Sequence, residues 1–117
     1  MSTAIPNPAP AAEGLPGEFY AQLAHGQLCF QRCDDCGAWR HPPREMCPHC
    51  QSWQWQWAPS SGRGVMYSWT VVHQAMHPSF VNEVPYAVVV VEMEEGVRVV
   101  SNLRDVPLEQ LRVGLPV

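Results

Sequence analysis

Four cysteines carry the clearest chemical signal in this sequence. Cys33 and Cys36 form one Cys-x-x-Cys pair, and Cys47 and Cys50 form a second pair after ten intervening residues. Each pair turns two sulfur atoms toward one point, so two pairs brought together by a hairpin give the tetrahedral thiolate cage that zinc prefers. Four protein ligands leave no open position for substrate water, which indicates a structural metal rather than a catalytic one. The sequence therefore predicts a structural zinc site at these four positions.

Other uses of paired cysteines fit this sequence less well. A thioredoxin-like redox centre needs a single Cys-x-x-Cys at a strand-to-helix junction, and a disulfide scaffold is typical of a secreted chain. The first fifteen residues lack the basic start and the apolar core of a signal peptide. Iron stays open as the metal, because four thiolates also suit an iron or iron–sulfur centre.

Three further residues with ligating or reactive side chains lie near the four cysteines. His41 and His49 lie inside the motif, but four sulfurs already fill the shell of the metal, so both are expected to be surface histidines. Cys29 precedes the first pair on a strand-like stretch, where a small buried thiol is the ordinary expectation. A nucleophilic role for Cys29 would need a basic partner, and the sequence reveals none.

The residues before the cysteines predict one helix and one strand. Phe19 and Leu23 are four residues apart and Gly26 follows them, which favours a short helix over residues 17–24 with a glycine stop. A strand over residues 27–32 then leads into the cysteine ribbon.

Three tryptophans follow the second cysteine pair at a period of two. Trp53, Trp55 and Trp57 alternate with Gln54 and Gln56, which predicts a strand with one indole face. Such a face can stack nucleic-acid bases, but no cations lie between the tryptophans as that use requires. We expect the indole face to pack against the ribbon or against the next part of the chain.

The remainder of the chain carries β signals. β-branched and aromatic residues predict strands over 65–73, 86–93 and 97–103, and the middle one is apolar on both faces, as a central strand would be. A Glu-Glu-Gly turn joins the last two strands as a hairpin, and residues 115–117 begin another strand. Strands with long loops after a zinc ribbon favour a small barrel of the OB type. That barrel is expected to be incomplete at the C-terminus, because closing five strands needs more residues than follow.

These signals divide the chain into three parts and make the predicted fold mainly β. A proline- and alanine-rich tail over residues 1–15 is expected to be disordered. The helix and the zinc ribbon occupy residues 16–58, and the OB-type barrel occupies residues 59–117. The loop Pro-Ser-Ser-Gly-Arg-Gly at 59–64 marks the boundary between the last two parts.

The charge balance bears on the class of partner. The chain has seven arginines, no lysine and eleven acidic residues, for a net charge of −4. Nonspecific nucleic-acid binding depends on clustered cations that neutralise phosphates, so this balance disfavours it. No apolar run in the sequence is long enough to span a membrane. Without such a run and without a signal peptide, we expect a cytoplasmic location and no membrane partner.

Four stretches of the sequence occur, in the same order and at similar spacings, in a known family. They are FYAQLAHGQLCFQRCDDCGAWRHPPREMCPHC, SGRGVMYSWTVVH, VPYAVVVVEMEEGVRVVSNL and LRVGLPV. In these stretches the chain resembles the zinc-ribbon/OB-fold acyl-CoA-associated family, which is catalogued as the domain of unknown function numbered thirty-five. The resemblance covers residues 18–117 and implies an N-terminal helix, a rubredoxin-like ribbon and an OB barrel.

The family resemblance also implies a function. Members bind acyl-CoA, or help a partner bind it, and typically accompany thiolase-superfamily enzymes: thiolases, acyltransferases, and aldolases of steroid side-chain degradation. The resemblance therefore implies a non-catalytic accessory subunit in a hetero-oligomer with a thiolase-like enzyme of lipid or steroid metabolism. The alternatives are a partner of a hot-dog-fold acyl-CoA hydratase and a nucleic-acid-binding zinc-ribbon/OB module.

No residue is predicted to be catalytic, because the sequence has no Ser-His-Asp order, no Gly-x-Ser-x-Gly motif and no glycine-rich phosphate loop. CoA carries phosphates, so arginines in or beside the ribbon loops are candidate ligand contacts, with aromatic and histidine residues of the barrel as further candidates. The candidate contacts are Arg40, Arg44, Arg63, Trp69, His73 and Tyr86. Each also has an ordinary structural interpretation, as a solvated surface arginine, a core aromatic or a surface histidine.

Overall fold

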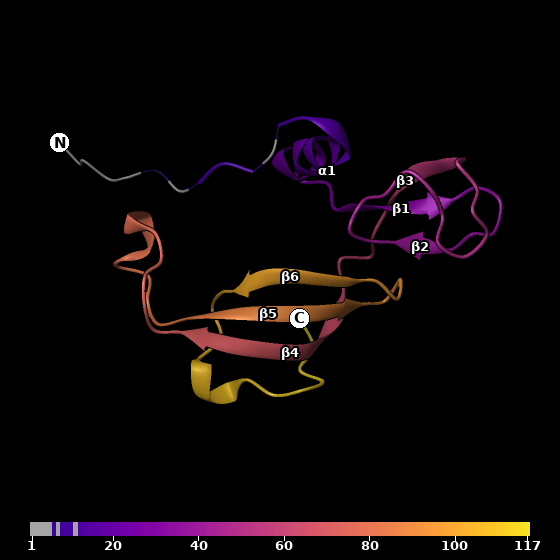
Figure 1. Ribbon diagram of the computed structural model, residues 1–117. Coiled ribbons are helices and arrows are strands. Elements are labelled where there is room, and N and C mark those ends of the chain that lie inside the picture. Colours follow the sequence, from indigo (N-terminus) through magenta and orange to yellow (C-terminus); the bar gives the residue numbers. More distant parts are fainter. Residues whose placement is uncertain (1–5, 7, 11) are drawn as a thin grey trace.

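One helix and two small antiparallel sheets make up the described part of the chain, residues 6, 8–10 and 12–117 of this computed structural model (Figure 1). The helix α1 (Gly14–Ala24) comes first. The first sheet has the strand order β2-β1-β3, and the second has the order β4-β5-β6. The bounds are β1 Cys29–Cys33, β2 Trp39–Arg40, β3 Trp55–Pro59, β4 Gly64–Val72, β5 Tyr86–Met93 and β6 Arg98–Leu103, with two 3-10 turns, η1 Pro78–Phe80 and η2 Leu108–Gln110.

The helix begins inside the segment that was expected to be a disordered tail. That segment, residues 1–15, lies partly outside the described residues, and α1 already starts at Gly14. The first turn closes because the Gly17 N–H donates to the Glu13 carbonyl at 3.1 Å. Pro16 lies in this turn, where its missing N–H removes no helical hydrogen bond. In the described part of the chain, no helix has both the length and the apolar character needed to cross a membrane.

One aromatic side chain anchors α1 on the first sheet. Phe19 is buried, and its ring centroid lies 6.3 Å from that of Phe30 and 4.8 Å from that of His41. Trp57 of β3 joins the same cluster, 6.4 Å from Phe19. Because aromatic rings at these separations attract one another beyond their buried area, this cluster positions α1 against the ribbon.

The strands of the first sheet begin later than the sequence pattern predicts. β3 begins at Trp55 rather than at Trp53, because Trp55 is where the strand first pairs with β1, opposite Cys33. Trp53 precedes this pairing and is 62% exposed. β1 likewise begins at Cys29 rather than at residue 27.

β5 is the central strand of the second sheet, as its apolar pattern predicted, and its bounds match the prediction. Its alternate side chains are buried and pack in the apolar core: Ala87, Val89, Val91 and Met93. Gly64 of β4 lies opposite Met93. A Cβ atom at Gly64 would lie 2.7 Å from the Glu92 carbonyl oxygen and 2.7 Å from a methyl carbon of Val91. Glycine is therefore what lets the start of β4 approach β5.

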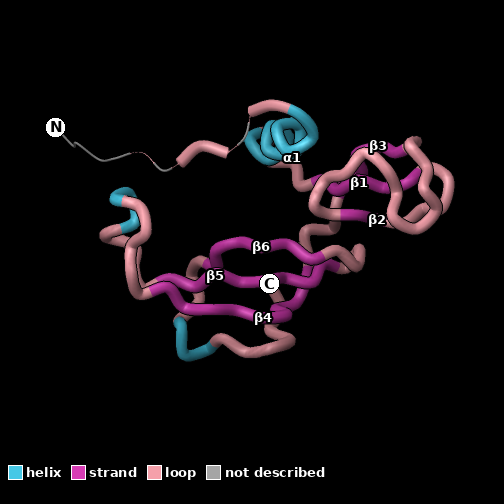
Figure 2. The backbone as a smooth tube through the Cα atoms, viewed as in Figure 1, coloured by secondary structure: helices cyan, strands magenta, loops and turns pink. Residues whose placement is uncertain are grey.

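The second sheet does not close into a barrel. Residues 114–117 pair with the start of β4: Val117 and Gly64 exchange hydrogen bonds of 3.0 and 3.2 Å, and the Met66 N–H donates to the Leu115 carbonyl at 2.8 Å. This short pairing is the beginning of a strand that the sequence predicted. On the opposite side, β6 has no neighbouring strand besides β5 in the described part of the chain (Figure 2). The sheet is therefore open at that edge.

The loop between the two sheets is fastened to the turn between β5 and β6. Glu95 accepts hydrogen bonds from the Ser60 hydroxyl at 2.7 Å and from the Ser61 N–H at 2.9 Å. Arg63 pairs with Glu94 at 2.8 Å, and the hydrogen bond from Arg63 holds the pKa of Glu94 below its usual value. The loop at residues 59–64, which the sequence predicted to be the boundary between the two parts, is thus held by specific hydrogen bonds and one ion pair.

Candidate metal centre and neighbouring cavities

The four predicted metal ligands converge on one point. The sulfur atoms of Cys33, Cys36, Cys47 and Cys50 all lie within 4.8 Å of one another. The separation is 3.5 Å from Cys33 to Cys50 and 3.6 Å from Cys36 to Cys47. A tetrahedral zinc ion with Zn–S bonds of about 2.3 Å places its sulfurs about 3.8 Å apart. The four cysteines are therefore positioned to bind a metal ion.

Two backbone turns of the same design aim the sulfurs. In the first turn the Gly37 N–H donates to the Cys33 carbonyl at 3.0 Å, and in the second the Gln51 N–H donates to the Cys47 carbonyl at 2.9 Å. The residue that closes each turn has a left-handed backbone, with φ of 75° at Gly37 and 63° at Gln51. Glycine adopts that conformation freely, whereas a side chain strains it by about 1 kcal/mol. The sequence indicated the first of these positions, and only the structure shows the second.

The four thiols differ in their tendency to ionise. The N–H of Cys36 hydrogen-bonds to the Cys33 sulfur and lowers the pKa of Cys33 to about 6, and the N–H of Cys50 lowers the pKa of Cys47 in the same way. At Cys50 the N–H of Ser52 acts in that direction, but the neighbouring Cys33 sulfur and burial outweigh it and raise the pKa to about 12. Like charges at these separations disfavour one another, so a cation is needed for all four sulfurs to be thiolates together.

A buried polar cluster beside the metal site had no signal in the sequence. Gln31 is fully buried, and Arg40 is 5% exposed. The Gln31 Oε1 accepts hydrogen bonds from the Arg40 Nε at 3.1 Å and from the Arg44 backbone N–H at 2.7 Å. The Arg40 Nη2 donates to the Arg44 carbonyl at 2.8 Å, and the guanidinium lies over the ring of Trp55. The surface interpretation of Arg40 is therefore wrong, because its hydrogen bonds go to ribbon groups and hold the loop that ends at Arg44.

His41 is half-buried, contrary to the expectation of a surface histidine. Its ring lies near Phe19 and Phe30, at centroid separations of 4.8 and 5.2 Å. Burial lowers the pKa of the imidazole, and its Nδ1 has no hydrogen-bond partner in the described part of the chain. His49 is exposed, as expected, and Cys29 is half-buried rather than fully buried.

The three tryptophans do not form a free stacking surface. Trp57 packs against the apolar core. Trp55 lies edge-on to Trp57, at a centroid separation of 5.2 Å, and under the guanidinium of Arg40. Only Trp53 is largely exposed. The packing interpretation is thus confirmed for Trp55 and Trp57, and one exposed indole does not make the stacked platform that a nucleic-acid-binding module needs.

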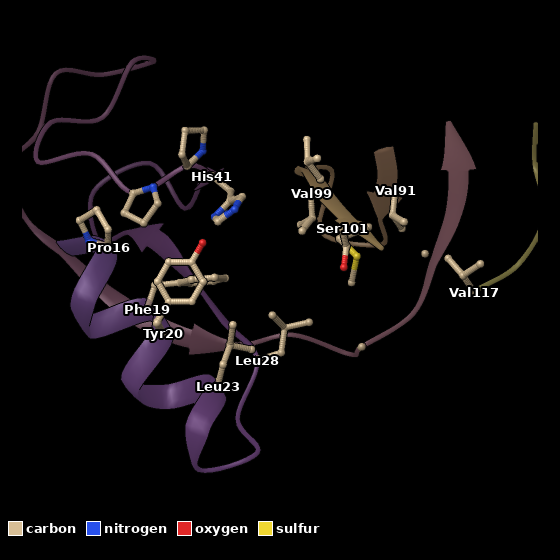
Figure 3. Close-up of a pocket in the computed structure, with 16 residues that line it drawn as sticks. Pro16, Phe19, Tyr20, Leu23, Leu28, His41, Val91, Val99, Ser101 and Val117 are labelled. Atoms are coloured by element: carbon tan, nitrogen blue, oxygen red, sulfur yellow. The ribbon is translucent and has the colours of Figure 1, made fainter. Parts of the chain in front are cut away.

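A cavity of about 570 Å³ lies between α1 and the second sheet (Figure 3). Phe19, Tyr20 and Leu23 of α1 line one side of it, and Val99 and Val100 of β6 line the other. Most of the lining side chains are apolar, so the cavity suits an apolar group. We call this cavity the apolar groove.

A second cavity, of about 450 Å³, lies between the ribbon and the β5–β6 hairpin, and we call it the basic cleft. Three of the seven arginines line it: Arg40, Arg44 and Arg98. Glu92 also lines it and pairs with Arg98 at 3.5 Å. In a chain of net charge −4, this local concentration of cations favours an anionic group. Sequence reasoning missed Arg98 because it comes from a strand far from the ribbon along the chain.

The other four candidate ligand contacts lie elsewhere. Arg63 is paired with a glutamate of the β5–β6 turn. Trp69 is 37% exposed, too much for the core position expected of it. Tyr86 is half-buried against Phe80, with ring centroids 5.7 Å apart, and His73 is exposed just after β4. None of these four lines the basic cleft.

Two family models match consecutive parts of the chain. The model described as "ChsH2, rubredoxin-like zinc ribbon domain" matches residues 21–56, and the model described as "ChsH2, C-terminal OB-fold domain" matches residues 57–117. The chain therefore belongs to the ChsH2 family of zinc-ribbon/OB-fold proteins. This confirms both the family resemblance and the predicted order of a zinc ribbon followed by an OB fold.

Similar proteins with descriptive names include subunits and a scaffold protein. The chain is 38% identical to a probable enoyl-CoA hydratase alpha subunit of Thermomonospora curvata over 110 aligned residues. The aligned region covers 94% of this chain and 34% of that protein. It is 34% identical to a DUF35 domain-containing scaffold protein of Methanocaldococcus jannaschii over 87 aligned residues. This aligned region covers 74% of this chain and 61% of that protein. The chain thus spans about a third of the first relative and three fifths of the second.

A solved structure has the same fold. A chain of the Ltp2-ChsH2(DUF35) aldolase matches with a TM-score of 0.84 and 37% sequence identity, over 92% of this chain and 84% of that one. At this identity and coverage the likeness extends through both the ribbon and the second sheet.

Proposed function

We propose that this chain is a non-catalytic accessory subunit that assembles with an acyl-CoA enzyme of the thiolase superfamily. The observation that carries the proposal is the likeness, over 92% of this chain, to a chain of the Ltp2-ChsH2(DUF35) aldolase. In this proposal the bond-making and bond-breaking steps belong to the partner enzyme, which is a thiolase, an acyltransferase or an aldolase of lipid or steroid metabolism in the cytoplasm. The accessory chain supplies a rigid surface and part of the binding site for acyl-CoA.

Co-expression tests the accessory role. The chain is produced alone and together with each thiolase-superfamily protein of the source organism, and the products are separated by size. We expect a complex of fixed stoichiometry with one of them, and acyl-CoA turnover by the complex but not by the chain alone. Turnover by the purified chain alone, or the absence of a complex with every thiolase-like protein, would overturn the proposal.

A hot-dog-fold acyl-CoA hydratase is the second candidate partner. The observation that favours it is the 38% identity to a probable enoyl-CoA hydratase alpha subunit. Co-expression with hydratase subunits distinguishes the two partners. If the chain assembles with a hydratase and with no thiolase-like protein, the hydratase is its partner and the accessory role is retained.

The four cysteines are proposed to hold a structural zinc ion. Their donor atoms are all sulfur, they lie within 4.8 Å of one another, and a fourth thiolate takes the position that a catalytic zinc keeps open for water. Zinc would supply a crosslink between the two turns rather than a reactive centre. Elemental analysis of the folded chain should give one zinc per chain. Stoichiometric iron in its place, or a disulfide between Cys33 and Cys36, would contradict the assignment.

The basic cleft is the proposed place for the phosphates of acyl-CoA. Arg44 and Arg98 are exposed and line the cleft, where Arg98 also lies 3.5 Å from Glu92. Arginine binds phosphate oxygens through paired hydrogen bonds, and a phosphate would compete with Glu92 for Arg98. Arg40 is buried and acts through the loop that it holds. Arg63, Trp69, His73 and Tyr86 stay candidates for contacts that the ligand makes inside the complex.

Calorimetric titration of coenzyme A into the purified chain tests the cleft. Arg44→Gln and Arg98→Gln should each weaken binding about tenfold, because a hydrogen bond between charged groups is worth roughly 1.5 kcal/mol or more. Arg112→Gln is the control, since this arginine is exposed and does not line the cleft. An equal loss in the control, or no loss in either cleft variant, would place the phosphates elsewhere.

A further inference from the structure

Arg40 is a buried cation that has no carboxylate partner among the described residues. It is 5% exposed, and neither of the two ion pairs in that part of the chain includes it. Its Nε donates to the amide oxygen of Gln31 at 3.1 Å and its Nη2 to the Arg44 carbonyl at 2.8 Å, and both acceptors are uncharged. Its Nη1 has no acceptor there. Because buried charges are ordinarily paired with an opposite charge, Arg40 indicates that an anion binds close by.

The walls of the basic cleft carry an excess of positive charge. Arg40, Arg44 and Arg98 line it, against the single carboxylate of Glu92. Glu92 lies 3.5 Å from Arg98 and offsets part of this charge. His41 also lines the cleft, and burial lowers the pKa of its imidazole, so it adds no charge at neutral pH. Three positive charges and one negative charge leave an excess of two, which matches a dianion.

A phosphate monoester is a biological anion of this charge. Near neutral pH it carries about −1.5 to −2 on a single phosphorus with three acceptor oxygens, whereas each phosphorus of a pyrophosphate bridge carries about one negative charge. Coenzyme A contains both groups, the bridge within its chain and the monoester on its ribose. The monoester concentrates its charge at one point, as the converging arginines of the cleft require.

The buried amide of Gln31 fixes the part of the cleft that contains Arg44. Its Oε1 accepts from the Arg44 backbone N–H at 2.7 Å, and its Nε2 donates to the Arg44 carbonyl at 2.8 Å. Arg44 is thereby held beside Arg40 before any ligand arrives. Because the Nη1 of Arg40 is itself buried, Arg40 acts on an anion through its charge, which solvent and salt screen less than they screen an exposed charge.

We propose that the basic cleft is a site for a phosphate monoester, which Arg44 and Arg98 contact and which the buried charge of Arg40 attracts. In coenzyme A this group is the phosphate on the ribose, and the pyrophosphate bridge lies outside the cleft. The inference rests on the proposed function, because it names the part of acyl-CoA that this chain recognises. It is measured on the full chain without an enzyme, so it fails separately from the accessory role.

Two ligands that differ by one phosphate test the cleft. Coenzyme A and dephospho-coenzyme A, which lacks the ribose phosphate, are titrated into the full chain by calorimetry. We expect coenzyme A to bind at least tenfold more tightly, because the monoester adds hydrogen bonds between charged groups. Equal affinities would overturn the inference and leave the bridge as the group that the cleft holds.

Variants of Arg40 separate its charge from its support of the loop. Arg40→Gln keeps a side chain that can form hydrogen bonds and removes the charge, so it should abolish most of the preference for coenzyme A. Arg40→Lys keeps the charge and should retain most of that preference. Arg112→Gln is the control, because Arg112 is exposed and does not line the cleft. Equal losses in the two Arg40 variants would mean that Arg40 only supports the loop, which would overturn its part in the inference.

Arg98→Gln repeats the test at an exposed residue, where folding is not at risk. It should weaken coenzyme A about tenfold and dephospho-coenzyme A much less, whereas equal weakening of both would overturn the inference. Loss of zinc from Arg40→Gln with an unchanged preference would assign the charge of Arg40 to the metal site instead. A clear preference in a chain that assembles with no enzyme would keep the phosphate site and remove the accessory role. A complex with an enzyme but no preference would do the reverse.

Discussion

The ribbon and the second sheet hold themselves together in different ways. In the ribbon, four sulfurs within 4.8 Å of one another join two turns, which suits a part too small to be stabilised by a hydrophobic core alone. The second sheet relies on apolar burial, with Met66 and Val89 each 1% exposed, and among the described residues β6 has β5 as its one neighbouring strand. The ribbon is not self-contained, because its Phe30 belongs to the same buried apolar cluster as Met66 and Val89 of the second sheet. Both cavities described above lie beside the second sheet, the apolar groove next to β6 and the basic cleft next to the β5–β6 hairpin.

Removal of one sulfur should break the ribbon and spare the sheet. Structural zinc binds zinc-finger peptides with about 10–16 kcal/mol, as much as the whole stability of a typical domain. We therefore expect Cys36→Ser to lose the metal and unfold the ribbon, seen as a loss of zinc and of the near-ultraviolet circular dichroism of Trp55 and Trp57. Cys29→Ser is the matched control, because Cys29 lies outside the sulfur cluster. If the Cys36→Ser chain binds no metal but melts as the unaltered chain does, metal binding does not stabilise the ribbon and this explanation is wrong.

A methyl group at Gly64 should damage the second sheet and spare the ribbon, which is the reverse of the effect expected for Cys36→Ser. It would lie 2.7 Å from the Glu92 carbonyl oxygen, and such overpacking costs on the order of 1–3 kcal/mol. Hydrogen exchange of the β4 and β5 amides should accelerate in Gly64→Ala while the zinc content stays the same. Loss of zinc in this variant would show that the proposed parts 16–58 and 59–117 do not hold independently.

Substitutions at the two metal-site turns should give the smallest effects, and effects of opposite sign. Gly37→Ala puts a side chain on a left-handed backbone and should destabilise the chain by about 1 kcal/mol. Gln51→Gly removes such a side chain and should stabilise it by up to about 1 kcal/mol. Denaturant unfolding at fixed free zinc measures both. A loss of stability in Gln51→Gly would mean that the Gln51 side chain contributes more than its backbone conformation costs.

Sequence reasoning succeeded where the signal is local and failed where burial depends on distant neighbours. The bounds of β5 followed from its apolar pattern, and the convergence of the cysteines followed from two short turns. Arg40 had the ordinary interpretation of a solvated surface arginine, and His41 was expected at the surface because four sulfurs already fill the shell of the metal. They are buried or half-buried because Gln31 and Phe19, from other elements, pack against them.

Two properties of this protein follow from the sequence by itself: a four-cysteine site, and an apolar central strand after a ribbon. Both depend on spacings of a few residues, which the backbone geometry of turns and strands converts directly into structure. Only the tertiary structure decided that Arg98 joins Arg40 and Arg44 in the basic cleft, and that α1 faces the open edge of β6 across the apolar groove. Such neighbours come from the packing of segments far apart along the chain, and no local pattern records that packing.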